Sequence, residues 1–400
     1  MATKTVKRAY KFRFYPTDEQ AAELARTFGC VRVVWNQILE RRTRRYVQEK
    51  VSTSYGDSST MLTELKRQAD FEWLNEVSSV PLQQALRHQS AAFQNFFGKR
   101  ARYPRRKTRK KSKASAEYTS SAFRFKDGLL YLAKMREPLD VAWSRALDYE
   151  SCKTVTVSRD RAGRYFVSLL CEDVIEELPR TDSIVGIDFG VTSAITTSDG
   201  LKSSPAVKRA QRKVDRAQRR LSRTEKGSGR RERARLRLAR RHAKVSDIRR
   251  DWMHKITTHL IRDNQAVVVE DLNASGMTRR AHGRGRRAKA SLNRGILNHA
   301  PFEMRRQLEY KADWYGREVI VADRWFPSSQ ICSKCGHREG KMPLGIRQWK
   351  CSSCKTIQDR DVNAAINLKN VAVGLAETQN ARGGPVRPLA SADAYSGSAR

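Results

Sequence analysis

The sequence predicts a multidomain α+β protein: an antiparallel β-barrel with a helical insertion, followed by an α/β domain that carries a small four-cysteine module. Three observations predict this fold class. Residues 122–172 contain short strand patterns separated by turn signals, residues 17–98 contain long helical patterns, and from residue 184 apolar strands alternate with helices. A chain of 400 residues is long enough for two or three compact units.

The charge of the chain is strongly positive. It has 80 Lys and Arg against 42 Asp and Glu, a formal net charge of +38. Such a chain binds polyanions, and nucleic acid is the expected partner because basic residues neutralise phosphates and release counterions. An anionic membrane is the weaker alternative, since no long apolar run is present and residues 1–11 lack the apolar core of a signal peptide. We expect a cytoplasmic, nucleoid-associated protein with no membrane partner.

The first half of the chain begins with a strand pattern and continues as helices. Residues 10–16 (YKFRFYP) alternate aromatic and basic side chains, and a proline ends the run. Apolar residues then recur at helical spacing over residues 17–47 and 82–97, with a polar loop expected at 51–60 before another short helix. If the first strand joins those at 122–172, which have turn signals at Asp127-Gly128 and Ala162-Gly163, the helices are an insertion in the barrel.

A basic linker follows the helices. Residues 99–113 (KRARYPRRKTRKKSK) hold ten basic residues and no acid. We do not expect them to fold comfortably without a partner, and we predict that they contact phosphates, with Arg105 and Arg106 among the nucleic-acid ligands. Phe96, Phe97 and Tyr103 could stack on unpaired bases, but core packing is the expected role of the two phenylalanines.

The second half of the chain has an α/β pattern. IVGIDFG near residue 186 and VVVED near residue 269 are buried strands, and a helix near 302–315 precedes the strand VIVAD. Between the first two, residues 205–262 form two arginine-rich helical patterns split at Gly227–Gly229, and residues 201–250 contain twenty Lys or Arg and four acids. Unpaired like charges repel, so a nucleic-acid channel is favoured over a solvated helix face. Its predicted lining residues are Arg219, Arg220, Arg230, Arg231, Arg240 and Arg241.

Four of the seven cysteines form a metal-ligand pattern. Cys332 and Cys335, then Cys351 and Cys354, give C-x2-C, fifteen residues and C-x2-C. Each pair lets a tight turn present two thiolates to one tetrahedral ion, and four sulfur ligands leave no open position, so we predict a structural zinc ion. His337 is then a neighbour of the site and not a ligand. The scattered Cys30, Cys152 and Cys171 give no sign of a disulfide framework.

Three acids mark a candidate catalytic centre. Asp188 and Glu270 each end a buried apolar strand, and Asp361 opens the last helix. Converging carboxylates can hold two Mg²⁺ ions, or Mn²⁺ in their place, for phosphodiester hydrolysis. Taken singly, the three could instead be a turn former, a surface charge and a helix N-cap. Asp271 and Asp359 compete for the second and third positions, and spacing alone does not exclude them.

Several sequence blocks resemble those of the TnpB family, the RNA-guided nucleases of insertion sequences that are related to compact type V CRISPR effectors. The resemblance covers nearly the whole chain apart from its tail. It includes the opening segments YKFRFYPTDEQ and VVWNQILE and, later, the blocks GIDFG, VVVEDLN, FPSSQICSKCG and DRDVNAAINL. In this family the three acids correspond to Asp188, Glu270 and Asp361, and the chain departs from the pattern at none of them.

The resemblance implies a fold and partners that the residues alone do not. It implies a wedge-type barrel with a helical recognition insertion, and a RuvC domain of RNase H-like fold around the zinc module. It also implies a guide RNA, a double-stranded DNA target and a short flanking motif, with Tyr55, Gln83 and Gln84 in the matching region. The alternatives are an unguided nuclease or transposase acting on DNA ends, and a regulator that binds without cutting. The implied domains are 1–16 with 115–180 (barrel), 17–114 (insertion and linker), 181–325 with 357–375 (RuvC), 326–356 (zinc module) and 376–400 (disordered tail).

Overall fold

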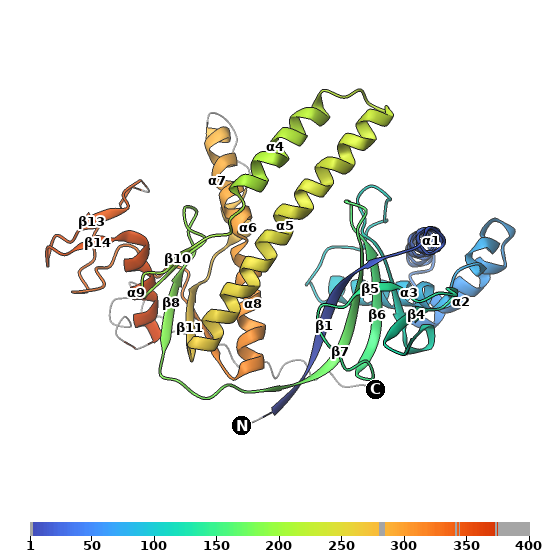
Figure 1. Cartoon of the computed structure of the whole chain (residues 1–400), viewed down its shortest axis with the longest axis horizontal. Coiled ribbons are helices and arrows are strands. Elements are labelled where there is room, and N and C mark those ends of the chain that lie inside the picture. The colour runs from blue at the N-terminus through green and yellow to red at the C-terminus, as the bar shows by residue number, and fades with distance from the viewer. Residues whose placement is uncertain (1–2, 280–284, 341, 344, 373, 375–400) are drawn as a thin grey trace. The chain divides into compact units, whose positions relative to one another are not determined.

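The computed structural model describes residues 3–279, 285–340, 342–343, 345–372 and 374. The expected disordered tail lies outside these residues. The described residues divide into two compact units, one spanning Thr5–Val174 and the other built from the described residues that follow it together with Thr3 and Lys4 (Figure 1). In the described part of the chain, no helix combines the length and the apolar character that crossing a bilayer requires.

The first unit contains a five-stranded sheet in the order β2-β6-β7-β1-β5. The pairs β1 with β5, β2 with β6 and β6 with β7 run antiparallel. A separate hairpin, β3 with β4, turns at Asp127 and Gly128, which both have positive φ as the predicted Asp-Gly turn requires. The strands are β1 (Thr3–Tyr15), β2 (Ala114–Thr119), β3 (Phe123–Lys126), β4 (Leu129–Leu132), β5 (Asp140–Ala142), β6 (Cys152–Arg159) and β7 (Tyr165–Glu176).

The helices of this unit lie between β1 and β2 in the chain, as predicted for an insertion. They are α1 (Asp18–Glu49), α2 (Tyr55–Arg67) and α3 (Ser79–Phe97), with 3₁₀ turns at Ala69–Asn75 and Ser120–Ala122. The expected loop at 51–60 is shorter than predicted, because α2 begins at its fifth residue. Ser54 and Asp57 form a capping box in which each side chain accepts a backbone N–H of the other residue, and this starts the helix inside a polar segment.

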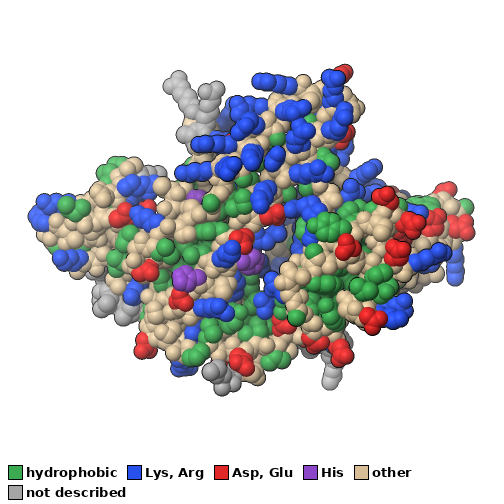
Figure 2. Space-filling model, viewed as in Figure 1, with side chains coloured by type: hydrophobic (Ala, Val, Ile, Leu, Met, Phe, Trp, Pro, Cys, Tyr) green, Lys and Arg blue, Asp and Glu red, His purple; other side chains and the backbone are tan. Residues whose placement is uncertain are grey.

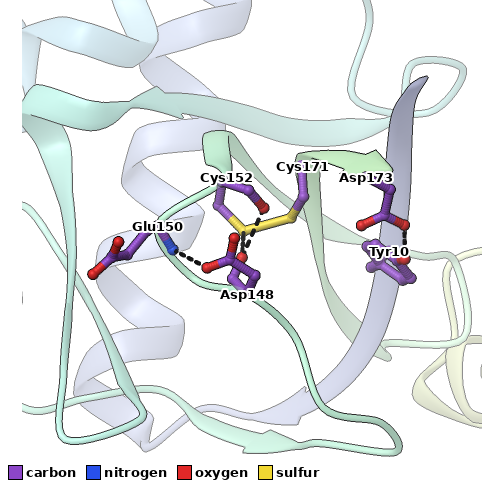
Figure 3. Close-up of a disulfide and its surroundings, with 7 residues drawn as sticks. Tyr10, Asp148, Glu150, Cys152, Cys171 and Asp173 are labelled. Atoms are coloured by element: carbon purple, nitrogen blue, oxygen red, sulfur yellow. Dashed lines mark hydrogen bonds between the residues drawn. A yellow bond between two sulfur atoms is a disulfide. The ribbon is translucent and has the colours of Figure 1, made fainter. Parts of the chain in front are cut away.

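A disulfide joins the two strands β6 and β7, which corrects the expectation from the scattered cysteines. Cys152 and Cys171 are partners in the antiparallel register, and their sulfurs are bonded (Figure 3). Beside this disulfide, the Tyr10 hydroxyl donates a hydrogen bond to Asp173 (Figure 3). Cysteine spacing does not reveal this pair, because it depends on the register of the two strands. The third scattered cysteine, Cys30, is a buried thiol whose pKa burial raises to about 11.

The second unit is built on a mixed sheet in the order β10-β9-β8-β11-β12. The outer pairs β10 with β9 and β9 with β8 are antiparallel, while β8 with β11 and β11 with β12 are parallel. A second small sheet pairs β13 with β14. The strands are β8 (Ile184–Asp188), β9 (Ile195–Thr197), β10 (Lys202–Ser203), β11 (Ala266–Glu270), β12 (Glu318–Ala322), β13 (Gln348–Lys350) and β14 (Ile357–Asp359).

Helices pack on both faces of this sheet because its central strands are apolar on both sides. Val267 and Val269 of β11 pack in one cluster with residues of α5 and α8, whereas Val268 packs in another with Leu368 of α9. The arginine-rich hairpin is formed by α4 and α5 as predicted, but α7 was not predicted. The helices are α4 (Lys208–Ser222), α5 (Gly229–Asp263), α6 (Ala274–Met277), α7 (Arg286–His299), α8 (Pro301–Tyr315) and α9 (Arg360–Ala372).

The helix α9 packs directly against the backbone of β8 at Gly186. A Cβ atom at Gly186 would lie 2.0 Å from the carbonyl oxygen of Ala365 and 2.6 Å from the backbone nitrogen of Lys369. Backbone atoms cannot move aside as a flexible side chain can. Glycine at this position therefore allows the close approach of α9 to the sheet at Ala365 and Lys369.

Replacing Gly186 by alanine is expected to displace α9, which carries Asp361, and so to lower both stability and cleavage. The loss of unfolding free energy should be about 1–3 kcal/mol, as in other overpacked cores. Urea unfolding and a cleavage assay measure the two effects. Gly29→Ala in α1 is the control, because nothing lies within 4 Å of its added Cβ and alanine favours a helix. Equal stability of the two variants would contradict this account.

Candidate functional site

Three carboxylates converge at one edge of the second sheet. Asp188 and Glu270 are the last residues of β8 and β11, which are parallel neighbours with Ile187 opposite Val269. Their side chains therefore emerge at the same, carboxyl edge of the sheet. Asp361 lies in the first turn of α9, which packs on β8.

The electrostatics of Asp188 indicate that the three acids face one another. The pKa of Asp188 is raised well above its usual value, first by burial and then by the charges of Glu270 and Asp361. Burial also raises the pKa of Glu270, against the opposing effect of a hydrogen bond from Ser328. Buried like charges are unfavourable without a counter-charge, so this edge of the sheet is suited to a cation.

The two competing acids are engaged elsewhere. Asp271 forms ion pairs with Arg305 at 3.0 Å and with Arg324. Asp359 accepts hydrogen bonds from the backbone N–H groups of Asp361 and Val362, at 3.1 and 3.0 Å, and so caps α9. It also pairs with Lys202 at 2.7 Å, and its pKa is lowered because these contacts outweigh its partial burial. The N-cap role considered for Asp361 thus belongs to Asp359.

Glu270 and Asp361 each have a polar partner from the segment that follows β12. The Ser328 hydroxyl donates to Oε1 of Glu270 at 2.6 Å, and Ser328 is buried. The Arg347 guanidinium donates to Oδ1 of Asp361 at 3.2 Å and to the Thr192 hydroxyl at 3.1 Å. Sequence reasoning missed Ser328 and Arg347, because contacts across 58 and 14 residues of sequence leave no local pattern.

Two asparagines of α9 tie this segment to the helix. Asn367 donates to the carbonyls of Ser328 and Ile331 at 2.8 and 2.7 Å, and Asn363 donates to Ile331 at 2.7 Å. The Asn363 side chain also accepts the backbone N–H of Ser333 at 2.8 Å. Both asparagines are almost fully buried, so these bonds are shielded from water. They connect the helix that bears Asp361 with the serine that contacts Glu270.

The four predicted zinc ligands form one compact cluster. The sulfurs of Cys332 and Cys354 are 3.6 Å apart, and those of Cys335 and Cys351 are 3.7 Å apart. A tetrahedral ion with zinc–sulfur bonds of about 2.3 Å holds its sulfurs about 3.8 Å apart, so the residues fit a zinc ion. Among the described residues, only these cysteines form a group of three or more metal-binding side chains with ligand atoms all within 4.8 Å. The three carboxylates are more widely spaced.

Each cysteine pair lies on a tight turn with the same construction. The backbone N–H of Gly336 bonds to the carbonyl of Cys332, and that of Lys355 bonds to Cys351. Gly336 and Lys355 both have positive φ, at 76° and 61°, which closes the turns. His337 bonds to the Ser352 hydroxyl at 3.0 Å and lies outside the four-cysteine cluster, in agreement with its predicted role as a neighbour.

Lysine and arginine side chains gather over the α4–α5 hairpin (Figures 1 and 2). Of the six predicted channel residues, Arg231 is already engaged, because its guanidinium donates to the carbonyls of Leu221 and Thr224 and so fixes the loop between the helices. The other five are exposed. A concave stretch of α5 is lined by Arg233, Leu236, Arg237, Arg240 and Arg241.

The predicted nucleic-acid residues of the first unit lie in two places. The Tyr55 hydroxyl donates to the Gln83 side chain at 2.9 Å, with the Arg87 guanidinium 4.8 Å from the Tyr55 ring, and Gln84 is half-buried on the same helix as Gln83. Arg105 and Arg106 are exposed on the linker, and Arg106 has a weak 3.4 Å contact with Glu40. The structure thus brings Tyr55 and Gln83 together.

Three family models match parts of the chain. "Probable transposase" (OrfB_IS605) matches residues 165–281, and the "Cas12f1-like, TNB domain" model matches residues 302–368, which include the four cysteines and Asp361. A "Helix-turn-helix domain" model matches residues 1–50, where the structure has the strand β1 and the single helix α1.

The class of protein follows from its relatives, which are named as nucleases. A relative from Streptomyces pristinaespiralis, named as an RNA-guided DNA endonuclease, is 54% identical over 96% of this chain and 92% of its own length. Another from Escherichia coli K12, named InsQ in the same class, is 33% identical over 90% of this chain and 91% of its own length. The chain belongs to the TnpB family, the RNA-guided nucleases of insertion sequences.

A solved structure shares the fold at low sequence identity. The Cas12f1 chain of a Cas12f1–sgRNA–target DNA complex aligns with a TM-score of 0.53 and 13% identity, over 92% of this chain and 99% of that chain. This likeness supports the mixed α/β fold.

Proposed function

We propose that this protein is an RNA-guided DNA endonuclease that hydrolyses phosphodiester bonds with divalent metal ions held by Asp188, Glu270 and Asp361. The observation that carries this proposal is the placement of the three acids: Asp188 and Glu270 end two parallel neighbouring strands, and Asp361 lies in the first turn of the helix packed on β8. Three neighbouring acids repel one another when ionised, so they favour a bound cation. The net charge of +38 on the whole chain favours binding to the phosphates of nucleic acid.

The donor set fits Mg²⁺ or Mn²⁺. Carboxylate oxygens are hard ligands, and a divalent cation would relieve the mutual repulsion that raises the pKa of Asp188. When bound, two such ions supply an activated water and a counter-charge for the leaving oxygen. The protein's own part is to keep the acids in place: Ser328 orients Glu270, Arg347 holds Asp361, and Asp359 caps the helix that carries Asp361.

Replacing Ser328 by alanine is expected to weaken metal binding about 10–100-fold, the usual effect of losing a partner of a metal ligand. Mn²⁺ binding to the purified protein, measured by electron paramagnetic resonance, reports this without relying on cleavage. Ser329→Ala, one residue along the chain, is the matched control, since no described acid bonds its hydroxyl. Unchanged Mn²⁺ affinity in the Ser328 variant would show that Glu270 needs no such support.

The roles of the individual domains are part of the same proposal. We assign the wedge role to residues 1–16 and 115–180, recognition to 17–114, and the RuvC nuclease fold to 181–325 with 357–375. Residues 326–356 form a structural zinc module. The order β10-β9-β8-β11-β12, with acids at the ends of the two parallel neighbours β8 and β11, supports the nuclease assignment. Tyr55, Gln83 and Gln84 are candidate readers of the motif beside the target.

The guide RNA is tested by purification from cells that also carry the flanking DNA of the gene. We expect a discrete RNA to copurify, and ribonuclease treatment to abolish cleavage of a matching duplex while leaving the protein folded. Cleavage that survives the treatment would favour an unguided nuclease or a transposase acting on DNA ends. Guide-dependent binding without any cleavage in Mg²⁺ or Mn²⁺ would favour a regulator.

A further inference from the structure

An aromatic cluster lies where α3 ends. Phe96 and Phe97 have ring centroids 5.3 Å apart, and Tyr103 meets Phe96 edge-to-face at 5.3 Å. Phe93 lies beneath them, 6.2 Å from Phe97 and 5.5 Å from Tyr103. Phe93 is buried, but Phe97 is 71% exposed and Tyr103 is 42% exposed. The core role expected for Phe97 is therefore wrong. We call Phe96, Phe97 and Tyr103 the aromatic platform.

The platform is held in place from the side of α1. The hydroxyls of Tyr103 and Thr43 are hydrogen-bonded at 2.8 Å. The Arg42 guanidinium lies 4.3 Å from the Phe93 ring and donates to the Thr53 carbonyl at 2.8 Å, and burial lowers its pKa. The Tyr103 ring is thus held before any partner arrives, and the Phe97 ring lies against Phe93 and Phe96, which reduces the entropy lost on binding.

The basic linker next to the platform is docked along α1. Trp35 donates from its indole N–H to the Arg105 carbonyl at 3.0 Å. Asn36 exchanges two hydrogen bonds with the backbone of Lys107, at 2.9 and 2.7 Å. The Lys107 ammonium lies 3.8 Å from the Trp35 ring, and burial lowers its pKa. At Arg105 and Lys107 the backbone of the linker thus packs on α1, while the side chains of Arg102, Arg105 and Arg106 are exposed and available for phosphates.

The charge next to the platform decides what it binds. Residues 99–113 hold ten basic residues and no acid, so the occupant is a polyanion. A second copy of this chain also carries a net charge of +38 and would be repelled. Duplex nucleic acid stacks its bases on one another, so its internal base faces are not available to an aromatic ring. Single-stranded nucleic acid offers both phosphates and flat apolar base faces, which aromatic rings stack on without sequence preference.

We propose that the aromatic platform is a stacking site for unpaired bases of single-stranded nucleic acid, with the exposed arginines of the linker on the neighbouring phosphates. Phe97 and Tyr103 supply the exposed rings, and Phe96 and Phe93 support them from behind. The site goes beyond the proposed cleavage, since it uses no acid of the metal centre. It is therefore testable with metal removed, and its failure would leave the cleavage proposal standing.

The test uses the full chain, purified free of RNA and kept in EDTA. Wild type and the double variant Phe97→Ala, Tyr103→Ala are titrated with labelled 15-nucleotide oligo(U), oligo(dT) and a duplex of the same length, followed by fluorescence anisotropy. We expect the variant to lose about tenfold in affinity for single strands, the effect of losing one or two stacked bases. Its salt dependence should stay the same because no charge is removed. Loss with oligo(U) alone identifies RNA as the ligand, and loss with both oligomers identifies any single strand.

Two further variants and a mapping step isolate the stacking contribution. Phe97→Leu keeps an apolar side chain but no ring face and should also bind more weakly. Leu129→Ala removes a comparably exposed apolar side chain, 42% exposed, from β4 and should bind as wild type does. Photocrosslinking of 4-thiouridine RNA should label peptides within residues 95–107. Unchanged affinity in the double variant, an equal loss on duplex, absence of these crosslinks, or wild-type self-association that the double variant loses would each overturn the proposal.

Discussion

Replacing Asp188 by asparagine is expected to abolish cleavage and, at the same time, to stabilise the metal-free protein. The loss of cleavage should be at least about 100-fold, as when one preorganised electrostatic contact is removed from an active site. The gain in stability follows from the pKa of Asp188, which burial and then the charges of Glu270 and Asp361 raise. Ionised Asp188 is therefore less favourable in the folded chain than in the unfolded chain, and a neutral amide of similar shape does not carry this cost.

The pH dependence of this stabilisation has a definite sign. Between the ordinary pKa of aspartate and the raised pKa of Asp188, the folded protein holds a proton that the unfolded chain has released. The unfolding free energy of the metal-free wild type therefore falls as pH rises through this window. Above the raised pKa, Asp188 makes no further contribution to the pH dependence. The difference in Tm between the Asn variant and wild type should be small near pH 4 and larger at pH 7.5. Each kcal/mol should correspond to about 2–4 °C.

Thermal unfolding in EDTA and in Mg²⁺, together with a cleavage assay, measures both effects. Mg²⁺ should stabilise the wild type and have little effect on the Asn variant. Asp182→Asn, which changes an exposed acid just before β8, is the matched control and should cut normally with an unchanged Tm. Normal cleavage by the Asp188 variant would remove Asp188 from the active site. A lower Tm than wild type at pH 7.5 would refute the electrostatic account of the three acids.

Elements that depend on local pattern could be predicted from the sequence. The apolar runs before Asp188 and Glu270 form neighbouring strands, the Asp127-Gly128 turn forms a hairpin, and the glycines at 227–229 separate α4 from α5. The grouping of the four cysteines could also be predicted, because two C-x2-C pairs present their thiolates through local turns. In each case the information lies within a few residues of the feature.

Features that depend on register and long-range packing could not be predicted. The pairing of Cys152 with Cys171 follows from strand register, and spacing does not reveal it. The distinction between Asp359 and Asp361 depends on which residue caps α9, a difference of two residues. Phe97 is exposed although its neighbours pack together, because α3 ends at that residue. Helix α7 was missed because it lies in a basic and polar segment whose only large apolar residues are Leu292, Ile296 and Leu297.

Loss of the zinc ion is expected to abolish cleavage through the positions of the acids. Cys332, Trp349 and Cys351 are the buried residues of a very small cluster in the module, far too little apolar surface to fold without a metal. Cys351→Ser should therefore release zinc and unfold the module. The anchoring bonds from Asn367 to Ser328 and from Asn363 to Ile331 would be lost with it, leaving Glu270 and Asp361 without their supports.

Zinc content by a colorimetric chelator assay, limited proteolysis and cleavage measure this chain of effects. We expect about one zinc per wild-type chain, and in the Cys351 variant no zinc, rapid proteolysis within residues 331–356, and cleavage lowered at least about 100-fold. Oligonucleotide binding by the Thr5–Val174 unit should persist. Cys335→His is the matched control, because zinc accepts a Cys₃His ligand set and Cys335 is the exposed member of the four. This variant should keep both zinc and cleavage, since the positions of Glu270 and Asp361 depend on a folded module and not on the chemistry of the fourth ligand.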